Sequence, residues 1–158
     1  AYQVTSMLEG VVQRGTGVRI RAVGKPLAGK TGTTNDSRDT WFIGFSTDLA
    51  VGVYIGFDKP RSLGRRETGS SVAVPVFRDF MAQALANQPA IPFRIPPGIQ
   101  LVRIAGGTGL PAGPGERNVV LEAFKPGTVP KRSGPVLDGT EAEAAISGGR
   151  RAGTGGLY

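Results

Sequence analysis

The chain has 158 residues, of which 39% are hydrophobic, and its 25 glycines and 12 prolines are many for a compact domain of this size. It contains no cysteine and no histidine, which excludes cysteine nucleophiles, Ser-His-Asp triads and zinc sites built from thiolates or imidazoles. The formal net charge of +7 is spread along the chain without a basic run interleaved with aromatics, so we expect no nucleic-acid partner. We also expect no metal and no cofactor.

The first predicted element is a helix that ends at about Arg14. Its apolar residues follow the helical i, i+3, i+4, i+7 spacing, and they are Val4, Met7, Leu8, Val11 and Val12. Gly15 is expected to end the helix in the left-handed conformation. Because this stripe is already under way at the start of a chain that begins with Ala1, we expect a piece of a longer protein, with any export signal or membrane anchor upstream.

Strands are predicted next. The segment 18–23, with the sequence VRIRAV, alternates apolar and basic residues as a half-exposed strand does. Three further strands are predicted at Leu27 to Thr33, Trp41 to Ser46 and Leu49 to Phe57, and the short joint around Thr47 and Asp48 favours an antiparallel hairpin. The fold class expected is α+β, with an antiparallel sheet flanked by helices and followed by a Pro/Gly-rich tail.

A polar loop leads into a second predicted helix, with Pro75 in its first turn. Its stripe is Phe77, Phe80, Met81, Ala84 and Leu85. Residues 1–88 are then expected to form one unit, and 89–130 a Pro/Gly-rich extension with two short strands, IQLVRI and NVVLEAF. Residues 131–158 are expected to be a disordered low-complexity tail, because they contain too little apolar surface to offset the entropy of ordering.

Lys30 belongs to two overlapping motifs. Gly24 and Gly29-Lys30-Thr31 match the phosphate-binding pattern G-x-x-x-x-G-K-[ST], which needs a helix directly after the loop to hold the phosphates. The residues that follow, up to Ser37, offer no apolar stripe, and the next apolar run is predicted to be a strand. The sequence therefore disfavours a nucleotide-binding loop.

The second motif is Lys30-Thr31-Gly32, followed by Thr33. On a strand beside a cleft, Lys30 can attract a carboxylate, Thr31 can donate a hydrogen bond to it, and Gly32 lets a substrate backbone lie close to the strand. Taken alone, the same three residues favour an ordinary edge strand that bears a solvated lysine. Trp41 and the aromatic strands are predicted to belong to the core, and Asp39 and Asp58 to be turn or loop carboxylates.

Longer segments resemble a known family. In order along the chain they are YQVTSMLEGVVQRGTG, AGKTGTTND, DTWFIGFSTDLAVGVYIGFDKP and TGSSVAVPVFRDFM, and from about Tyr2 to Leu85 they resemble the C-terminal part of the transpeptidase domain of class A penicillin-binding proteins. The segments FRIPPGIQLVRI and EAFKPGTVP resemble an extension that some members carry. The resemblance implies catalytic roles for Lys30, Thr31 and Gly32, carboxylate binding by the Thr31 and Thr33 hydroxyls, and an oxyanion-binding backbone N–H at Thr33.

The chain departs from that family in one respect: no serine in it has a lysine three residues later, and no Ser-x-Asn occurs. The nucleophile is therefore expected upstream, in a bifunctional parent at the periplasmic face of the bacterial inner membrane. That parent would also be a glycosyltransferase, would bind peptidoglycan stem peptides and would be acylated by β-lactams, whereas this chain alone would be inactive. A non-catalytic peptidoglycan-binding or assembly module is the alternative, and a nucleotide-binding protein with a phosphate-binding loop is a distant third.

Overall fold

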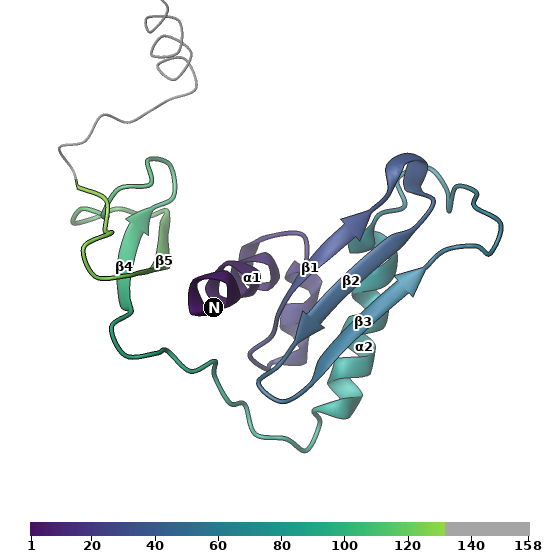
Figure 1. The fold of residues 1–158 in the computed structure, drawn as a ribbon, viewed down its shortest axis with the longest axis horizontal. Helices are drawn as coiled ribbons and strands as arrows, with labels where there is room; N and C mark the ends of the chain where they lie inside the picture. Colours follow the sequence, from purple (N-terminus) through teal and green to yellow (C-terminus); the bar gives the residue numbers. More distant parts are fainter. Residues whose placement is uncertain (132–158) are drawn as a thin grey trace, which may run out of the picture.

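A computed structural model describes residues 1–131 of the chain. The predicted α+β class and antiparallel sheet are confirmed (Figure 1). The elements in chain order are α1 (Tyr2–Arg14), η1 (Val18–Val23), β1 (Ala28–Thr33), η2 (Asn35–Ser37), β2 (Thr40–Phe45), β3 (Ala50–Ile55), η3 (Gly69–Ala73), α2 (Val74–Ala84), β4 (Gln100–Ala105) and β5 (Val119–Phe124). The tail predicted to be disordered falls almost entirely on residues 132–158, which lie outside the described residues.

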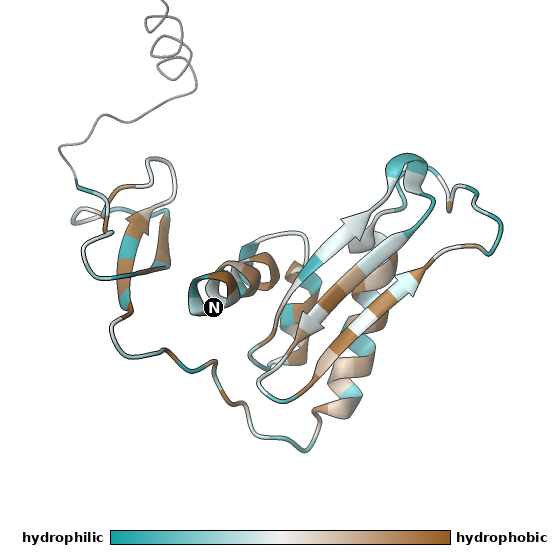
Figure 2. Ribbon diagram, viewed as in Figure 1, coloured by the Kyte–Doolittle hydropathy of each residue, from teal (hydrophilic) through white to brown (hydrophobic). Residues whose placement is uncertain are grey.

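The main sheet has the order β1-β2-β3, with antiparallel pairing throughout, so β1 lies at one edge. The predicted hairpin of β2 and β3 is confirmed, and its turn is closed by the Ser46 N–H, which donates to the Leu49 carbonyl at 2.8 Å. Figure 2 shows polar residues gathered at the β1–β2 connection and in the loop after β3, while hydrophobic residues recur along β2, β3 and α2. One end of the sheet is therefore polar.

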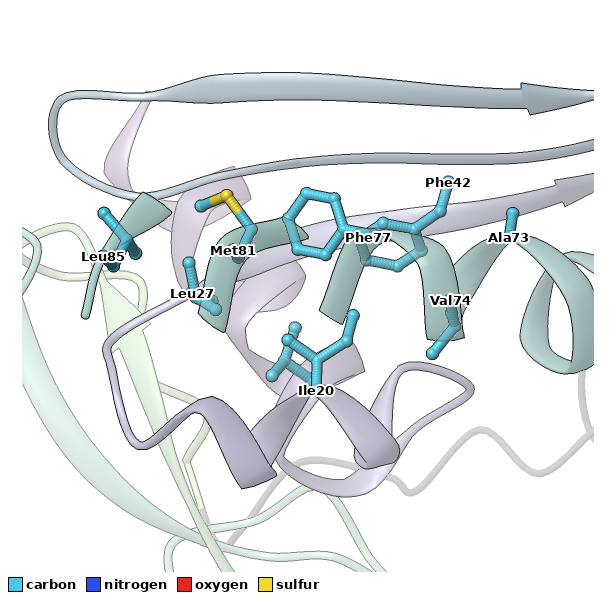
Figure 3. Packing of buried hydrophobic residues seen from close by; sticks show 9 residues of the cluster. Ile20, Leu27, Phe42, Ala73, Val74, Phe77, Met81 and Leu85 are labelled. Atoms are coloured by element: carbon cyan, nitrogen blue, oxygen red, sulfur yellow. The ribbon is translucent and has the colours of Figure 1, made fainter. Parts of the chain in front are cut away.

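The core lies between one face of the sheet and the helical segments η1 and α2 (Figure 3). Its fully buried larger side chains are Val12, Ile20, Leu27, Phe42, Val74, Phe77 and Met81. The rings of Phe42 and Phe77 lie with centroids 4.6 Å apart and planes tilted by 57°, an arrangement that adds to the free energy gained from burying both rings. This pair joins the middle of the sheet to α2.

Two glycines make room for that aromatic pair. Gly29 and Gly44 are cross-strand partners in β1 and β2. A Cβ on Gly29 would lie 2.6 Å from Cζ of Phe42, and a Cβ on Gly44 would lie 2.7 Å from Cζ of Phe77. Both distances are far below van der Waals contact, so glycine is needed at both positions for the rings to lie against the sheet.

Helix α1 ends at the predicted residue, but in a different way. Gly15 has φ −110° and ψ −152°, which is extended and not left-handed, so that expectation is wrong. The reason for glycine here is a close approach, because a Cβ on Gly15 would lie 3.0 Å from the Cα of Val11. The Gly15 and Gly17 N–H groups both donate to the Val11 carbonyl, at 3.1 and 3.0 Å, which folds the chain back sharply after the helix.

Residues 18–23 form the 3₁₀ helix η1, and the predicted strand there is wrong. Ile20 is fully buried and Val23 packs against the core, whereas Val18 is 45% exposed. The i, i+3 spacing of Ile20 and Val23 matches the three residues per turn of a 3₁₀ helix. A six-residue segment carries too few apolar positions for its period to be read from the sequence alone.

The second helical segment also begins earlier than predicted. The turn η3 has a π-helical hydrogen-bond pattern and starts at Gly69, inside the stretch predicted to be a loop, and α2 continues from it with Pro75 in its first turn. Thr68 caps the segment: its side chain accepts from the Ser71 N–H, and its own N–H donates to the Ser71 hydroxyl at 2.8 Å. Such reciprocal caps are strong helix starts.

The two strands predicted in the extension are present and form a separate antiparallel hairpin, β4 with β5. The hairpin lies on the side of α1 away from β1 (Figure 1). The Gln3 side-chain amide donates to the Ala123 carbonyl at 2.9 Å, and Arg14 pairs with Glu122 at 2.9 Å. The hairpin has its own small buried set, Ile104, Ala105 and Ala123. No helix within residues 1–131 has the length and hydropathy needed to cross a bilayer.

Glu9 of α1 gives a prediction about stability and pH. Its partly buried carboxyl lines a cavity of about 410 Å³ between α1, η1 and residues 90–92, and burial raises its pKa above the ordinary 4.5. A carboxyl with a raised folded-state pKa favours folding when protonated, and this contribution is lost as the pH rises through the folded-state pKa. Glu9→Gln should therefore raise the thermal midpoint at about pH 7 but not at about pH 3.

Thermal unfolding followed by circular dichroism at the two pH values measures this difference. Glu116→Gln, at an exposed position in the loop before β5, is the matched control and should shift the midpoint little at either pH. A Glu9→Gln midpoint that falls at neutral pH would show that the carboxylate has a stabilising partner.

Candidate active site

The four residues Lys30, Thr31, Gly32 and Thr33 all lie on the edge strand β1. Successive side chains of a strand point to opposite faces. Thr31 and Thr33 point to the face that η3 covers, since both lie against Gly69. Lys30 and Gly32 point to the other face, beside the exposed side chains of their cross-strand partners, Ile43 and Trp41.

The backbone of β1 offers hydrogen-bonding groups at its open edge. Hydrogen-bonded and non-hydrogen-bonded pairs alternate along an antiparallel ladder. The Thr34 N–H donates to the Asp39 carbonyl at 3.0 Å, which makes that pair a hydrogen-bonded one. By the register, Gly32 and Lys30 also face β2. The N–H and carbonyl groups of Thr31 and Thr33 consequently point away from the sheet, to where an extended peptide could pair with them.

Lys30 supplies the positive charge of the site. Its side chain is exposed, and its Nζ donates to the carbonyl of Thr31 at 3.1 Å, which holds the ammonium close to the open edge. The ion pairs found within residues 1–131 are Arg14–Glu122, Arg38–Asp36 and Arg78–Asp79. In that part of the chain no carboxylate neutralises Lys30, so its charge is available to an anionic ligand.

Both threonine hydroxyls are held by neighbours from other elements. Thr33 Oγ1 accepts from the Gly69 N–H at 3.0 Å, which is one of the first N–H groups of a helical segment and has no partner within it. Thr31 Oγ1 lies 2.9 Å from Thr16 Oγ1, in the turn between α1 and η1. Two elements distant in sequence therefore orient the two hydroxyls of one strand.

Gly69 must approach β1 and β2 closely for these contacts to form. A Cβ on Gly69 would lie 2.6 Å from the Trp41 carbonyl oxygen and 2.7 Å from that of Gly32. No larger residue fits this position without moving η3 away from the strands. Gly69 thereby fixes the distance between η3 and the Thr33 hydroxyl.

The turn after β1 is closed by side chains. Asp39 N–H donates to Thr34 Oγ1 at 2.8 Å, and the Asp39 carboxylate accepts from the Tyr54 hydroxyl at 2.8 Å. The hydrogen bond to Asp39 raises the pKa of Tyr54, with smaller contributions from burial and nearby negative charge. Asp39 thus acts as a turn carboxylate, as predicted, and Asp58 is exposed in the loop after β3. Trp41, predicted to be core, is 40% exposed and packs on Tyr54 with centroids 4.6 Å apart.

The structure argues against a phosphate-binding loop at Lys30. Lys30 lies inside an antiparallel strand, and no helix starts there. Gly24 has φ 70° and ends η1, and Gly29 is needed by the ring of Phe42. Each glycine of that pattern therefore has a structural reason of its own that involves no phosphate.

Sequence reasoning missed three residues of the site: Thr16, Gly69 and Ser70. The Ser70 hydroxyl donates to the Thr16 carbonyl at 2.8 Å and completes the link between the two turns. All three lie in short stretches of glycine and small polar residues, GTG and TGSS, which were interpreted as a helix stop and a loop. The available signal was a glycine next to a hydroxyl residue in each stretch.

The family model described as the penicillin binding protein transpeptidase domain matches residues 1–82. Penicillin-binding protein 1A of Rickettsia bellii (strain RML369-C) is 51% identical over 124 residues, which is 78% of this chain and 15% of that protein. Penicillin-binding protein 1A of Pseudomonas aeruginosa is 48% identical over 126 residues, 79% of this chain and 15% of that protein. Both matches are longer than the region that the family model covers.

A solved structure is also similar to this chain. The crystal structure of penicillin-binding protein 1A from Haemophilus influenzae superposes with a TM-score of 0.71 at 35% sequence identity, over 83% of this chain and 21% of that chain. The similarity thus extends to the fold. The chain spans only about 15% of the length of the curated relatives that it matches.

Proposed function

We propose that this chain, which belongs to the penicillin-binding protein transpeptidase family, carries one wall of the active site of a serine D,D-transpeptidase. The observation that carries the proposal is the open edge of β1, where an ammonium with no ion pair among residues 1–131, two oriented hydroxyls and outward-facing backbone groups lie within four consecutive residues. This set suits an extended peptide that ends in a carboxylate.

In the proposed reaction, a serine supplied by the remainder of the protein attacks the carbonyl carbon of the D-Ala-D-Ala peptide bond. An ester forms, the C–N bond breaks, and D-Ala leaves with a proton on its amine. The amine of a neighbouring stem peptide then attacks the ester, gives up its proton and restores the serine hydroxyl. A β-lactam would acylate the same serine.

The residues of this chain bind and orient the substrate in that scheme. The Lys30 ammonium draws in the terminal carboxylate and supports the hydroxyl network, and the hydroxyls of Thr31 and Thr33 donate to the carboxylate. The outward-facing N–H of Thr33 donates to the developing oxyanion, a contribution worth about 3 kcal/mol where single donors have been removed elsewhere. Gly32 leaves room for the substrate backbone on the strand.

The activities of the complete protein are part of the proposal. The parent would cross-link peptidoglycan stem peptides at the periplasmic face of the inner membrane, anchored by a segment upstream of this chain. Glycosyltransferase activity would belong to another domain. The extension 89–130 would belong to the same parent, since the matches to the relatives exceed the residues of the family model.

Labelling with a β-lactam tests the proposal. The isolated chain should form no covalent adduct with a fluorescent penicillin, because the serine-lysine pair that performs the attack is absent from it. The full-length protein should be labelled stoichiometrically. Mass spectrometry of both samples measures the adducts.

Two outcomes would contradict the assignment. Stoichiometric labelling of the isolated chain would mean that the nucleophile lies within it. A full-length protein that binds peptidoglycan but takes up no label would favour the non-catalytic binding or assembly module.

A further inference from the structure

We propose that Thr16 is a positioning residue that makes the Thr31 hydroxyl a hydrogen-bond donor toward an anionic ligand. The inference rests on the function proposed above and assigns to the turn between α1 and η1 a part in recognising the substrate carboxylate. Its starting point is the 2.9 Å contact between Thr16 Oγ1 and Thr31 Oγ1.

A hydroxyl has one hydrogen and two lone pairs, so it can either donate to an anion or donate elsewhere. At Thr33 the choice is fixed, because the Gly69 N–H can only donate and Thr33 Oγ1 receives it at 3.0 Å. The hydrogen of Thr33 is then free for a ligand. A carboxylate, which when ionised can only accept, is the ligand that such a hydroxyl suits best.

The hydrogen bond between Thr16 and Thr31 can have either direction, since each hydroxyl is able to donate. When an anion occupies the edge of β1, the favourable direction is the one in which Thr16 donates to Thr31 and Thr31 donates to the anion. Hydrogen bonds arranged head to tail in this way polarise one another. Thr16 then donates a hydrogen bond to the Thr31 hydroxyl, as the Gly69 N–H donates to the Thr33 hydroxyl, and leaves the hydrogen of Thr31 for the anion.

Thr16 is held in place for this task from three sides. The glycine before it approaches the Val11 backbone, and the N–H of the glycine after it donates to the Val11 carbonyl. The Thr16 carbonyl accepts from the Ser70 hydroxyl at 2.8 Å. Since Ser70 follows Gly69 in η3, one helical turn fixes both the residue that orients Thr31 and the group that orients Thr33.

The test compares acylation of the full-length protein by a penicillin and by its methyl ester, which lacks the anionic carboxylate. Thr16→Val keeps the shape of the side chain and removes the hydroxyl. It should lower the second-order acylation rate constant for the acid by about tenfold, the scale of one hydrogen bond to a charged group, and should leave that for the ester nearly unchanged. Thr16→Ser should restore the acid rate. Thr47→Val, in the β2–β3 turn at the other end of the sheet, is the matched control.

The outcomes separate this inference from the proposed function. If the unmutated protein is labelled and Thr16→Val slows the acid and the ester equally, or slows neither, Thr16 has no role in orienting Thr31 and the inference is overturned. If the unmutated protein takes up no label, the transpeptidase proposal fails first and the inference falls with it. Loss of discrimination between acid and ester, rescued by serine, supports it.

Discussion

Replacing Lys30 by alanine in the full-length protein should lower the second-order rate constant of acylation by a penicillin by about a hundredfold, the scale of a strong hydrogen bond to a charged group. The variant lacks the ammonium that attracts the carboxylate to the edge of β1 and that is held there by the Thr31 carbonyl. The serine nucleophile would still be present, so slow acylation should persist. Stopped-flow or gel-based labelling with a fluorescent β-lactam measures the rate.

Lys59→Ala is the matched control for this experiment. Lys59 is an exposed lysine in the loop after β3, so its removal changes the net charge by the same amount. It should leave the rate close to that of the unmutated protein. Because Lys30 is also exposed, its variant should unfold at nearly the same temperature, which separates loss of function from loss of fold. A Lys30→Ala protein that acylates at the unmutated rate would show that the site is assigned wrongly.

Phe77→Ala should destabilise the chain by about 3–5 kcal/mol, a large share of the free energy of unfolding of a small domain. Phe77 is fully buried, and its ring centroid lies 4.6 Å from that of Phe42. The absence of a side chain at Gly44 leaves room for the Phe77 ring. Truncation removes the buried ring and leaves a cavity that a rigid sheet and helix fill poorly. Urea unfolding of the isolated chain, followed by the fluorescence of the single tryptophan, Trp41, measures the change.

The same helix offers the control. Phe80 lies one turn further along α2 and is 50% exposed. Phe80→Ala should cost less than about 1 kcal/mol, because little of its surface is removed from water. Equal losses for the two variants would mean that the core does not lie where the structure places it.

The long, regular elements could be predicted from the sequence. Residues 41–55 contain two apolar runs with a short joint around Thr47 and Asp48, which favours a hairpin, and the stripe in residues 77–85 is long enough to show a helical period. The segment 18–23 was too short to distinguish a strand from a 3₁₀ helix. A left-handed conformation at Gly15 was expected from a general preference of glycine, whereas the actual requirement is a close local approach to the Val11 backbone, which depends on how the chain turns after the helix.

Some residues of the candidate site could be predicted from the sequence, and others could not. Lys30, Thr31, Gly32 and Thr33 were found through their resemblance to a family motif, and their chemical roles stay predictions until they are tested. Thr16 and Ser70 contact each other across 54 residues of sequence, and no local pattern indicates that contact. Trp41 was predicted to be buried because it lies in an apolar strand, but its side chain faces the side of the sheet that the helices do not cover.

The packing of the β4–β5 hairpin against α1 has a consequence for the order in which the chain folds. Its links to α1 join residues 120 and 108 positions apart, Gln3 with Ala123 and Arg14 with Glu122. Loop-closure entropy makes such distant contacts late events in folding. Because the ribosome makes β5 more than a hundred residues after α1, the hairpin cannot cover that flank of the helix until late in the synthesis of this segment. Since Arg14–Glu122 is an exposed pair and the hairpin buries few side chains of its own, this unit should also be the first to open, well before the Phe42–Phe77 core gives way.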